Sequence, residues 1–112
     1  MKKILISLVT IVTILSSLMT NPALAGNIEH GKQLFGSNCA SCHAGGKNVV
    51  NPKKTLSLAD LEANSKNSAA AITTQITKGA GAMPAFAGRL SPSDIEDVAS
   101  YIFSQAQNGW AK

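Results

Sequence analysis

The chain has 112 residues, a length typical of a single domain. Ten Lys and Arg residues stand against six Asp and Glu, which gives a formal net charge of +4. The basic residues form no run interleaved with aromatic residues, so the composition does not support nucleic-acid binding.

The first 25 residues have the pattern of a secretory signal peptide. Lys2 and Lys3 form a positive start, an apolar run covers residues 4–19, and Ala23-Leu24-Ala25 forms an A-x-A cleavage site. The apolar run is shorter than the roughly 20 residues that a membrane anchor needs. We therefore expect removal of residues 1–25, which leaves 87 of the 112 residues. Because two of the ten basic residues leave with this segment, the formal net charge falls to +2.

The first helix is expected over residues 28–37, after Asn27 as its N-cap, with Ile28, Leu34 and Phe35 facing inward. Gly31 lies four residues before Phe35 on the same face. A glycine there weakens a helix by roughly 1 kcal/mol relative to alanine. It therefore indicates the close approach of another backbone.

Three further helices are predicted along the rest of the chain. Ser57 and Asp60 resemble a capping box that begins a short helix, and Ser68 can cap a helix over residues 69–78 that Gly79 would end. The last helix, over residues 92–106, follows Ser91 and has an apolar stripe that consists of Ile95, Val98, Ala99, Ile102, Phe103 and Ala106.

The predicted fold class is all-α, with four helices and two long loops at residues 44–54 and 79–88. Convincing strand alternation is absent from the sequence. Loops of about ten residues are long for so small a helical domain, and they need something to pack on. A domain of this size usually contains a disulfide or a buried prosthetic group.

Cys39-Ala40-Ser41-Cys42-His43 is a C-x-x-C-H motif, the pattern of covalent haem attachment. Thiols three residues apart project from one helical turn and can reach both vinyl groups on one porphyrin edge. The adjacent His43 can then bind the iron through its imidazole. We therefore predict one covalently attached haem c.

Three other interpretations of the motif fit the sequence less well. A thiol–disulfide oxidoreductase of the thioredoxin type needs a βαβ context, and the sequence shows no strands. A zinc site would have to combine the motif with His30, and its spacing matches no zinc finger. A structural disulfide between Cys39 and Cys42 would close too short a loop to stabilise the fold much.

Met83 is the candidate for the second axial ligand of the iron. It is the only methionine after residue 25, and it lies in a loop of small residues, Gly79 to Phe86. His30 is the rival ligand, but it lies only nine residues before Cys39 and is expected on the solvated side of the first helix. Ligation by His43 and Met83 would favour ferrous iron and raise the reduction potential. It would also leave no open site for a ligand, unlike a haem sensor or a peroxidase.

The mature chain resembles the class I cytochromes c, and within them the photosynthetic cytochrome c6 family. The resemblance covers residues 26–112 and is carried by Asn38-Cys39-Ala40-Ser41-Cys42-His43-Ala44-Gly45-Gly46, Lys54-Thr55-Leu56, the stretch Gly79 to Phe86, Gly88-Arg89, Asp97-Val98-Ala99-Ser100-Tyr101-Ile102 and Trp110.

The resemblance implies roles for residues that the patterns alone leave open. Gly31 and Phe35 would lie where the first and last helices cross, with Tyr101 opposite. Gln75 would lie near the haem and help to set its potential. Arg89 would help the protein to dock with photosystem I.

The resemblance also implies an electron carrier rather than an enzyme. The carrier would accept electrons from cytochrome f of the b6f complex and deliver them to photosystem I in the thylakoid lumen. It would dock transiently with these membrane complexes. An alternative is a periplasmic cytochrome c that donates electrons to a respiratory terminal oxidase.

Overall fold

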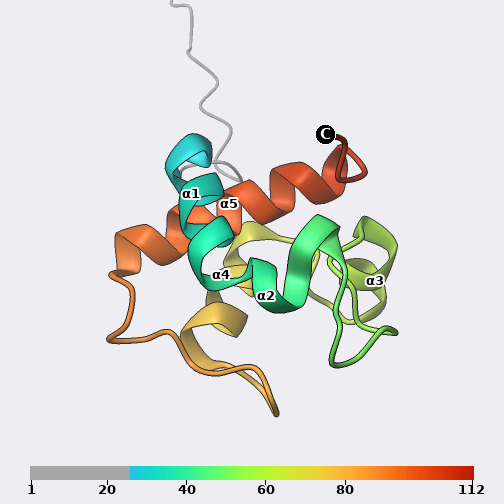
Figure 1. The fold of residues 1–112 in the computed structure, drawn as a ribbon, viewed down its shortest axis with the longest axis horizontal. Coiled ribbons are helices and arrows are strands. Elements are labelled where there is room, and N and C mark those ends of the chain that lie inside the picture. Colours follow the sequence, from blue (N-terminus) through green and yellow to red (C-terminus); the bar gives the residue numbers. More distant parts are fainter. Residues whose placement is uncertain (1–25) are drawn as a thin grey trace, which may run out of the picture.

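The computed structural model describes residues 26–112, so the expected signal peptide lies outside the described part of the chain. This part contains helices and connecting loops without a β-strand (Figure 1). The helices are α1 (Ile28–Asn38), α2 (Ala40–His43), the 3₁₀ turn η2 (Ala44–Gly46), α3 (Leu58–Ala63), α4 (Ala69–Lys78) and α5 (Pro92–Gln107).

Four of these helices begin at the N-caps that the sequence indicates. The side chains of Asn27, Ser57 and Ser68 each accept a hydrogen bond from a backbone N–H in the first turn of α1, α3 and α4. At α5, Ser91 and Asp94 form a complete capping box, in which each side chain accepts from the other residue's backbone N–H. The predicted all-α class is confirmed, because local capping and apolar periodicity agree at each of these helices.

Helix α2 is a fifth α-helix within residues 26–112 and was not among the four predicted. It consists of the single turn Ala40–His43 and continues into η2. One turn carries no apolar periodicity, and no side chain caps its N-terminus. Gly45 then adopts a φ of 65°, which turns the chain away from the helical direction.

Helices α1 and α5 cross in close contact, and α4 packs beside α5 (Figure 1). Gly31 of α1 is buried at the crossing, next to the backbone of Asp97 and the side chain of Tyr101. The rings of Phe35 and Tyr101 pack 5.3 Å apart between their centroids. The predicted close approach at Gly31 is therefore confirmed.

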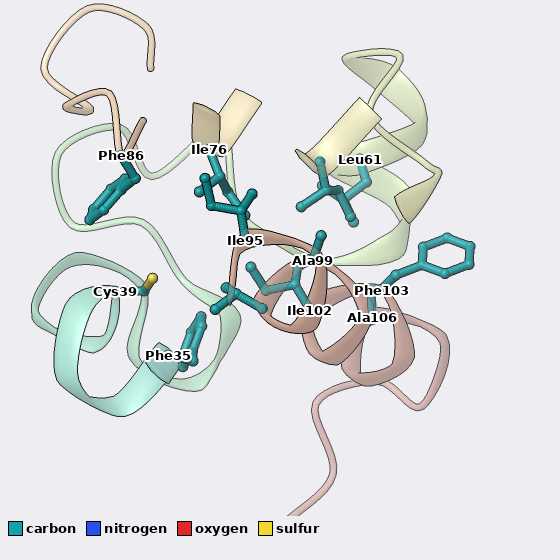
Figure 2. Packing of buried hydrophobic residues seen from close by; sticks show 12 residues of the cluster. Phe35, Cys39, Leu61, Ile76, Phe86, Ile95, Ala99, Ile102, Phe103 and Ala106 are labelled. Atoms are coloured by element: carbon teal, nitrogen blue, oxygen red, sulfur yellow. The ribbon is translucent and has the colours of Figure 1, made fainter. Parts of the chain in front are cut away.

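The apolar stripe of α5 forms the centre of the core. All six of its predicted members are buried. Figure 2 shows Ile95, Ala99 and Ile102 of α5 together with residues from α1, α3 and α4, including Phe35, Leu61 and Ile76. The core therefore joins the two ends of the described chain. The segments between them, within residues 38–89, line most of a cavity.

Within residues 26–112, the longest helix is too short and too polar to cross a membrane.

The segment between α4 and α5 is a loop with two isolated bridges, one between Ala80 and Met83 and one between Ala87 and Leu90. Phe86 anchors this loop, since its side chain is buried and its N–H donates to the carbonyl of Ile76.

Candidate haem-binding site

One cavity of about 700 Å³ brings together the six site residues that the sequence analysis singled out. Its size lies within the range of about 300–1,000 Å³ typical of small-molecule and cofactor sites. The α1–α2 junction, α4 and the loop before α5 contribute these side chains. They are Cys39, Cys42, His43, Gln75, Met83 and Arg89.

The two cysteines stand at the junction of α1 and α2, and both are free thiols. Cys39 is 9% exposed. Its burial, and to a smaller degree the neighbouring Cys42, raise the pKa of the Cys39 thiol to about 11. A nucleophilic cysteine of an oxidoreductase needs a lowered pKa, so the burial of Cys39 does not favour that interpretation of the motif.

His43 is held in one tautomer by a backbone carbonyl. Its Nδ1 lies 2.8 Å from the carbonyl oxygen of Lys47. A carbonyl can only accept a hydrogen bond, so Nδ1 is the donor, and in the neutral imidazole Nε2 is then the nitrogen that carries the lone pair. Histidines that bind metals are usually oriented in this way, by a hydrogen bond from the second ring nitrogen.

Met83 is carried by a tight turn. Its N–H donates to the carbonyl of Ala80, and the N–H of Ala80 donates to the carbonyl of Met83. Gly79 precedes this turn with a φ of 66°, and a Cβ atom there would lie 2.5 Å from the Met83 carbonyl oxygen. The turn therefore requires a glycine at position 79.

Gln75 reaches Met83 from α4. Its Nε2 lies 3.7 Å from the Met83 sulfur, within hydrogen-bonding distance for a sulfur acceptor. Arg89 lies at the exposed edge, with its guanidinium carbon 5.0 Å from the centroid of the Phe86 ring. Such an arrangement is a cation–π contact and holds the positive charge beside the cavity.

His30, the rival ligand, takes part in a different interaction. Its Nδ1 lies 2.7 Å from Oδ2 of Asp97, and this hydrogen bond joins α1 to α5. His30 does not belong to the cavity lining. Its side chain is 42% exposed, so His30 is partly solvated, as expected, and partly buried.

The residues present fit a haem. Two thiols, an imidazole nitrogen with a free lone pair and a thioether share one cavity. The remaining wall includes apolar side chains that suit a flat macrocycle, among them Leu61, Ile72, Ile76, Phe86 and Ile102. This combination of soft and imidazole ligands in an apolar setting is the chemistry of haem iron.

The sequence patterns gave no site role to Thr55, Asp60 or Trp110. Thr55 and Asp60 line the cavity and are joined by hydrogen bonds from the Thr55 hydroxyl and N–H to one carboxylate oxygen. These bonds lower the pKa of Asp60, with the side-chain bond as the larger cause. Trp110 was noted only as part of the resemblance, and its contacts join segments 54 residues apart in sequence.

Comparisons with known proteins agree with this geometry. A family model described as cytochrome c oxidase, cbb3-type, subunit III, a cytochrome c domain, matches residues 26–102. Cytochrome c6 of Synechocystis sp. is 62% identical over 80% of this chain and 75% of its own. Cytochrome c6 of Bumilleriopsis filiformis is 60% identical over 75% of this chain and 98% of its own.

A solved structure supports the same assignment. Cytochrome c6 of the diatom Phaeodactylum tricornutum superimposes with a TM-score of 0.74 at 45% identity. The match covers 76% of this chain and all of the diatom chain. Proteins of this kind hold one haem c covalently and carry electrons without acting as enzymes. This chain belongs to the cytochrome c6 family.

Proposed function

We propose that Cys39 and Cys42 would hold the haem as thioethers and that His43 and Met83 would bind its iron. The single observation that carries this proposal is the convergence of all four side chains on one cavity. They come from two segments separated by 40 residues, so their convergence depends on the whole fold.

Bound haem supplies a one-electron couple at its iron. The chain's own residues prepare that group for electron transfer. The Lys47 carbonyl accepts a hydrogen bond from Nδ1 of His43 and so orients the ring with Nε2 as the nitrogen that would bind the iron. The Gln75 amide holds the Met83 sulfur in place. With His43 and Met83 both bound to the iron, the protein would leave no open site for oxygen or peroxide.

The proposed route runs from cytochrome f of the b6f complex to photosystem I in the thylakoid lumen. The names and source organisms of the relatives, a cyanobacterium and algae, support this route. Arg89 supports it too, because an exposed cation at the cavity edge can steer the approach of a negatively charged partner surface. Contacts of this transient type are small, and their association rates fall with salt.

The test is the rate at which the purified reduced protein re-reduces flash-oxidised photosystem I. The Arg89→Ala variant should slow the second-order rate at low salt and approach the unsubstituted rate at high salt. Lys32→Ala removes the same charge from exposed α1 outside the cavity lining and serves as the matched control. A rate equal to that of an unrelated cytochrome, with or without Arg89, would refute the photosystem I route.

A respiratory terminal oxidase in the periplasm is a second candidate acceptor. The family model that matches residues 26–102 is described as an oxidase subunit, which favours this alternative. Oxygen uptake by membranes that contain the oxidase, measured with the reduced protein as the only donor, distinguishes the two acceptors. Uptake comparable to the photosystem I rate would make the protein a donor to both.

A further inference from the structure

Trp110 lies beyond the end of α5 and folds back toward the first helices. Gly109 and Trp110 both have positive φ values, of 67° and 57°. The N–H of Trp110 donates to the carbonyl of Gln105 at 2.8 Å. A positive φ at a large non-glycine residue costs of order 1 kcal/mol or more, so the contacts of the indole must outweigh this strain.

The indole contacts two parts of the chain at once. Its centroid lies 5.5 Å from that of Phe35 in α1. Its Nε1–H donates to the carbonyl of Leu56 at 2.8 Å. It also lies flat against Gly46, where a Cβ atom would be only 2.5 Å from three indole atoms.

Gly46 and Leu56 bracket the segment that orients His43. The N–H of Leu56 donates to the carbonyl of Gly46 at 2.7 Å, which closes the segment into a loop. The residue after Gly46 is Lys47, whose carbonyl accepts the Nδ1–H of His43 at 2.8 Å. Trp110 therefore touches both residues whose mutual hydrogen bond sets the position of that carbonyl.

We propose that Trp110 is a positioning residue for His43, acting through Gly46, Leu56 and the Lys47 carbonyl. The inference rests on the proposed binding of iron by His43. A carbonyl held in place keeps the Nδ1–H bond short and the imidazole a strong donor to iron. Without the indole contacts, the Lys47 carbonyl would be free to move. The hydrogen bond from His43 Nδ1 would then weaken, and the imidazole would donate less electron density to the iron.

The decisive variant is Trp110→Phe in the haem-loaded protein, because phenylalanine keeps a ring beside Phe35 but cannot donate to Leu56. Tyr101→Phe is the matched control, since Tyr101 packs in the same aromatic cluster, with its ring 6.1 Å from that of Trp110, and phenylalanine keeps that ring while the Trp110–Leu56 hydrogen bond stays intact. Nuclear magnetic resonance measures the exchange of the His43 Nδ1 proton with solvent, and voltammetry measures the reduction potential.

Trp110→Phe should exchange the His43 Nδ1 proton about fivefold faster or more, as the loss of one hydrogen bond predicts. Its potential should rise, because a weaker donor ligand stabilises ferric iron less. Tyr101→Phe should leave both quantities unchanged even where it lowers stability. Equal exchange rates and potentials in the two variants would overturn the inference while leaving the iron ligands as proposed.

The unsubstituted protein offers a test that needs no variant. If the indole holds the segment, the Trp110 Nε1 proton and the His43 Nδ1 proton become exposed in the same opening, with opening free energies that agree. Protection of the two protons that differs by about tenfold or more would overturn the inference. Absence of any haem-shifted His43 Nδ1 signal would instead refute the ligand assignment, and the inference with it.

Discussion

The backbone of Gly31 lies against the main-chain carbonyl of Asp97, at the point where α1 crosses α5. A Cβ atom on Gly31 would lie 2.1 Å from the Asp97 carbonyl oxygen and 2.9 Å from Cβ of Tyr101. The two helices therefore reach their observed separation only because position 31 has no side chain. This crossing joins the two ends of the domain and supports the core behind the cavity.

Gly31→Ala should lower the free energy of unfolding by about 3 kcal/mol, because backbone atoms of α5 cannot move aside cheaply. Guanidinium titration of the haem-loaded protein measures the change. Gly36→Ala is the matched control in the same helix, where a Cβ atom would meet nothing within 4 Å. This control should gain about 0.5–1 kcal/mol from the lower backbone entropy of its unfolded state. Equal effects at the two glycines would contradict the observed crossing.

Gln75→Leu should lower the reduction potential. The amide donates to the Met83 sulfur and, with Met83 bound to the iron as proposed, would draw electron density from that ligand and so favour ferrous iron. Loss of a hydrogen bond of roughly 1 kcal/mol corresponds to about 40 mV for one electron. Voltammetry measures the shift, with Gln107→Leu at the exposed end of α5 as control. A rise in potential, or the same shift in the control, would show that Gln75 does not act on Met83.

Asp60 makes a testable contribution to the pH dependence of stability. Hydrogen bonds from Thr55 lower its pKa in the folded state below the ordinary value of 3.8. A carboxyl group with a lowered pKa in the folded state stabilises the fold at pH values above its unfolded-state pKa. This stabilisation is lost as the pH falls through the folded-state pKa. The contribution of Asp60 to stability should therefore be constant above about pH 4 and should decrease as the pH falls below that value.

Thr55→Val removes the larger of the two causes and should raise the Asp60 pKa toward its ordinary value. Carboxyl resonances followed through an acid titration of the reduced protein measure this pKa. Thr74→Val, whose hydroxyl donates to Ala70 in α4, should leave it unchanged. An Asp60 pKa that is the same in both variants would mean that the Thr55 hydroxyl does not stabilise the carboxylate.

Protein purified from its native host should begin at Gly26. In the structure, the N–H of Gly26 donates to the buried Ser100 hydroxyl at 3.2 Å, and a Cβ atom on Gly26 would collide with α5. Intact mass gives the first residue, together with the mass of one haem. A mature chain that retains the first 25 residues would contradict the expected cleavage after Ala25.

Met83→Ala should open one axial position and lower the potential, because the thioether that favours ferrous iron is gone. The reduced variant should bind carbon monoxide, which optical spectroscopy detects. Met83 lies on a loop outside the helices, so helical content should remain that of the unsubstituted protein. An unchanged potential together with no binding of carbon monoxide would exclude Met83 as a ligand.

Local patterns predicted most of the fold. The caps at Asn27, Ser57, Ser68 and Ser91 lie where the sequence indicates, because capping depends on residues three or four apart. The buried stripe of α5 follows from helical periodicity alone. Helix α2 was missed, since a single turn without a side-chain cap leaves no periodic signal.

The residues that line the candidate site were predictable where chemistry restricts the choice of residue, and unpredictable where contacts are distant in sequence. Cys39, Cys42 and His43 belong to one short motif, and Met83 is the only methionine after residue 25. The role of Trp110 depends on a contact across 54 residues, and no local pattern encodes such a contact. The bond between Gln75 and Met83 likewise needs α4 and the following loop to be placed first.

The central claim is that His43 and Met83 both bind the iron, which makes the protein a carrier with a closed haem. Addition of carbon monoxide to the reduced, unsubstituted protein at neutral pH tests this most directly. The absorption spectrum should not change, because neither axial position is open. Ready formation of a carbon monoxide complex would contradict the claim and indicate a haem with an open coordination site.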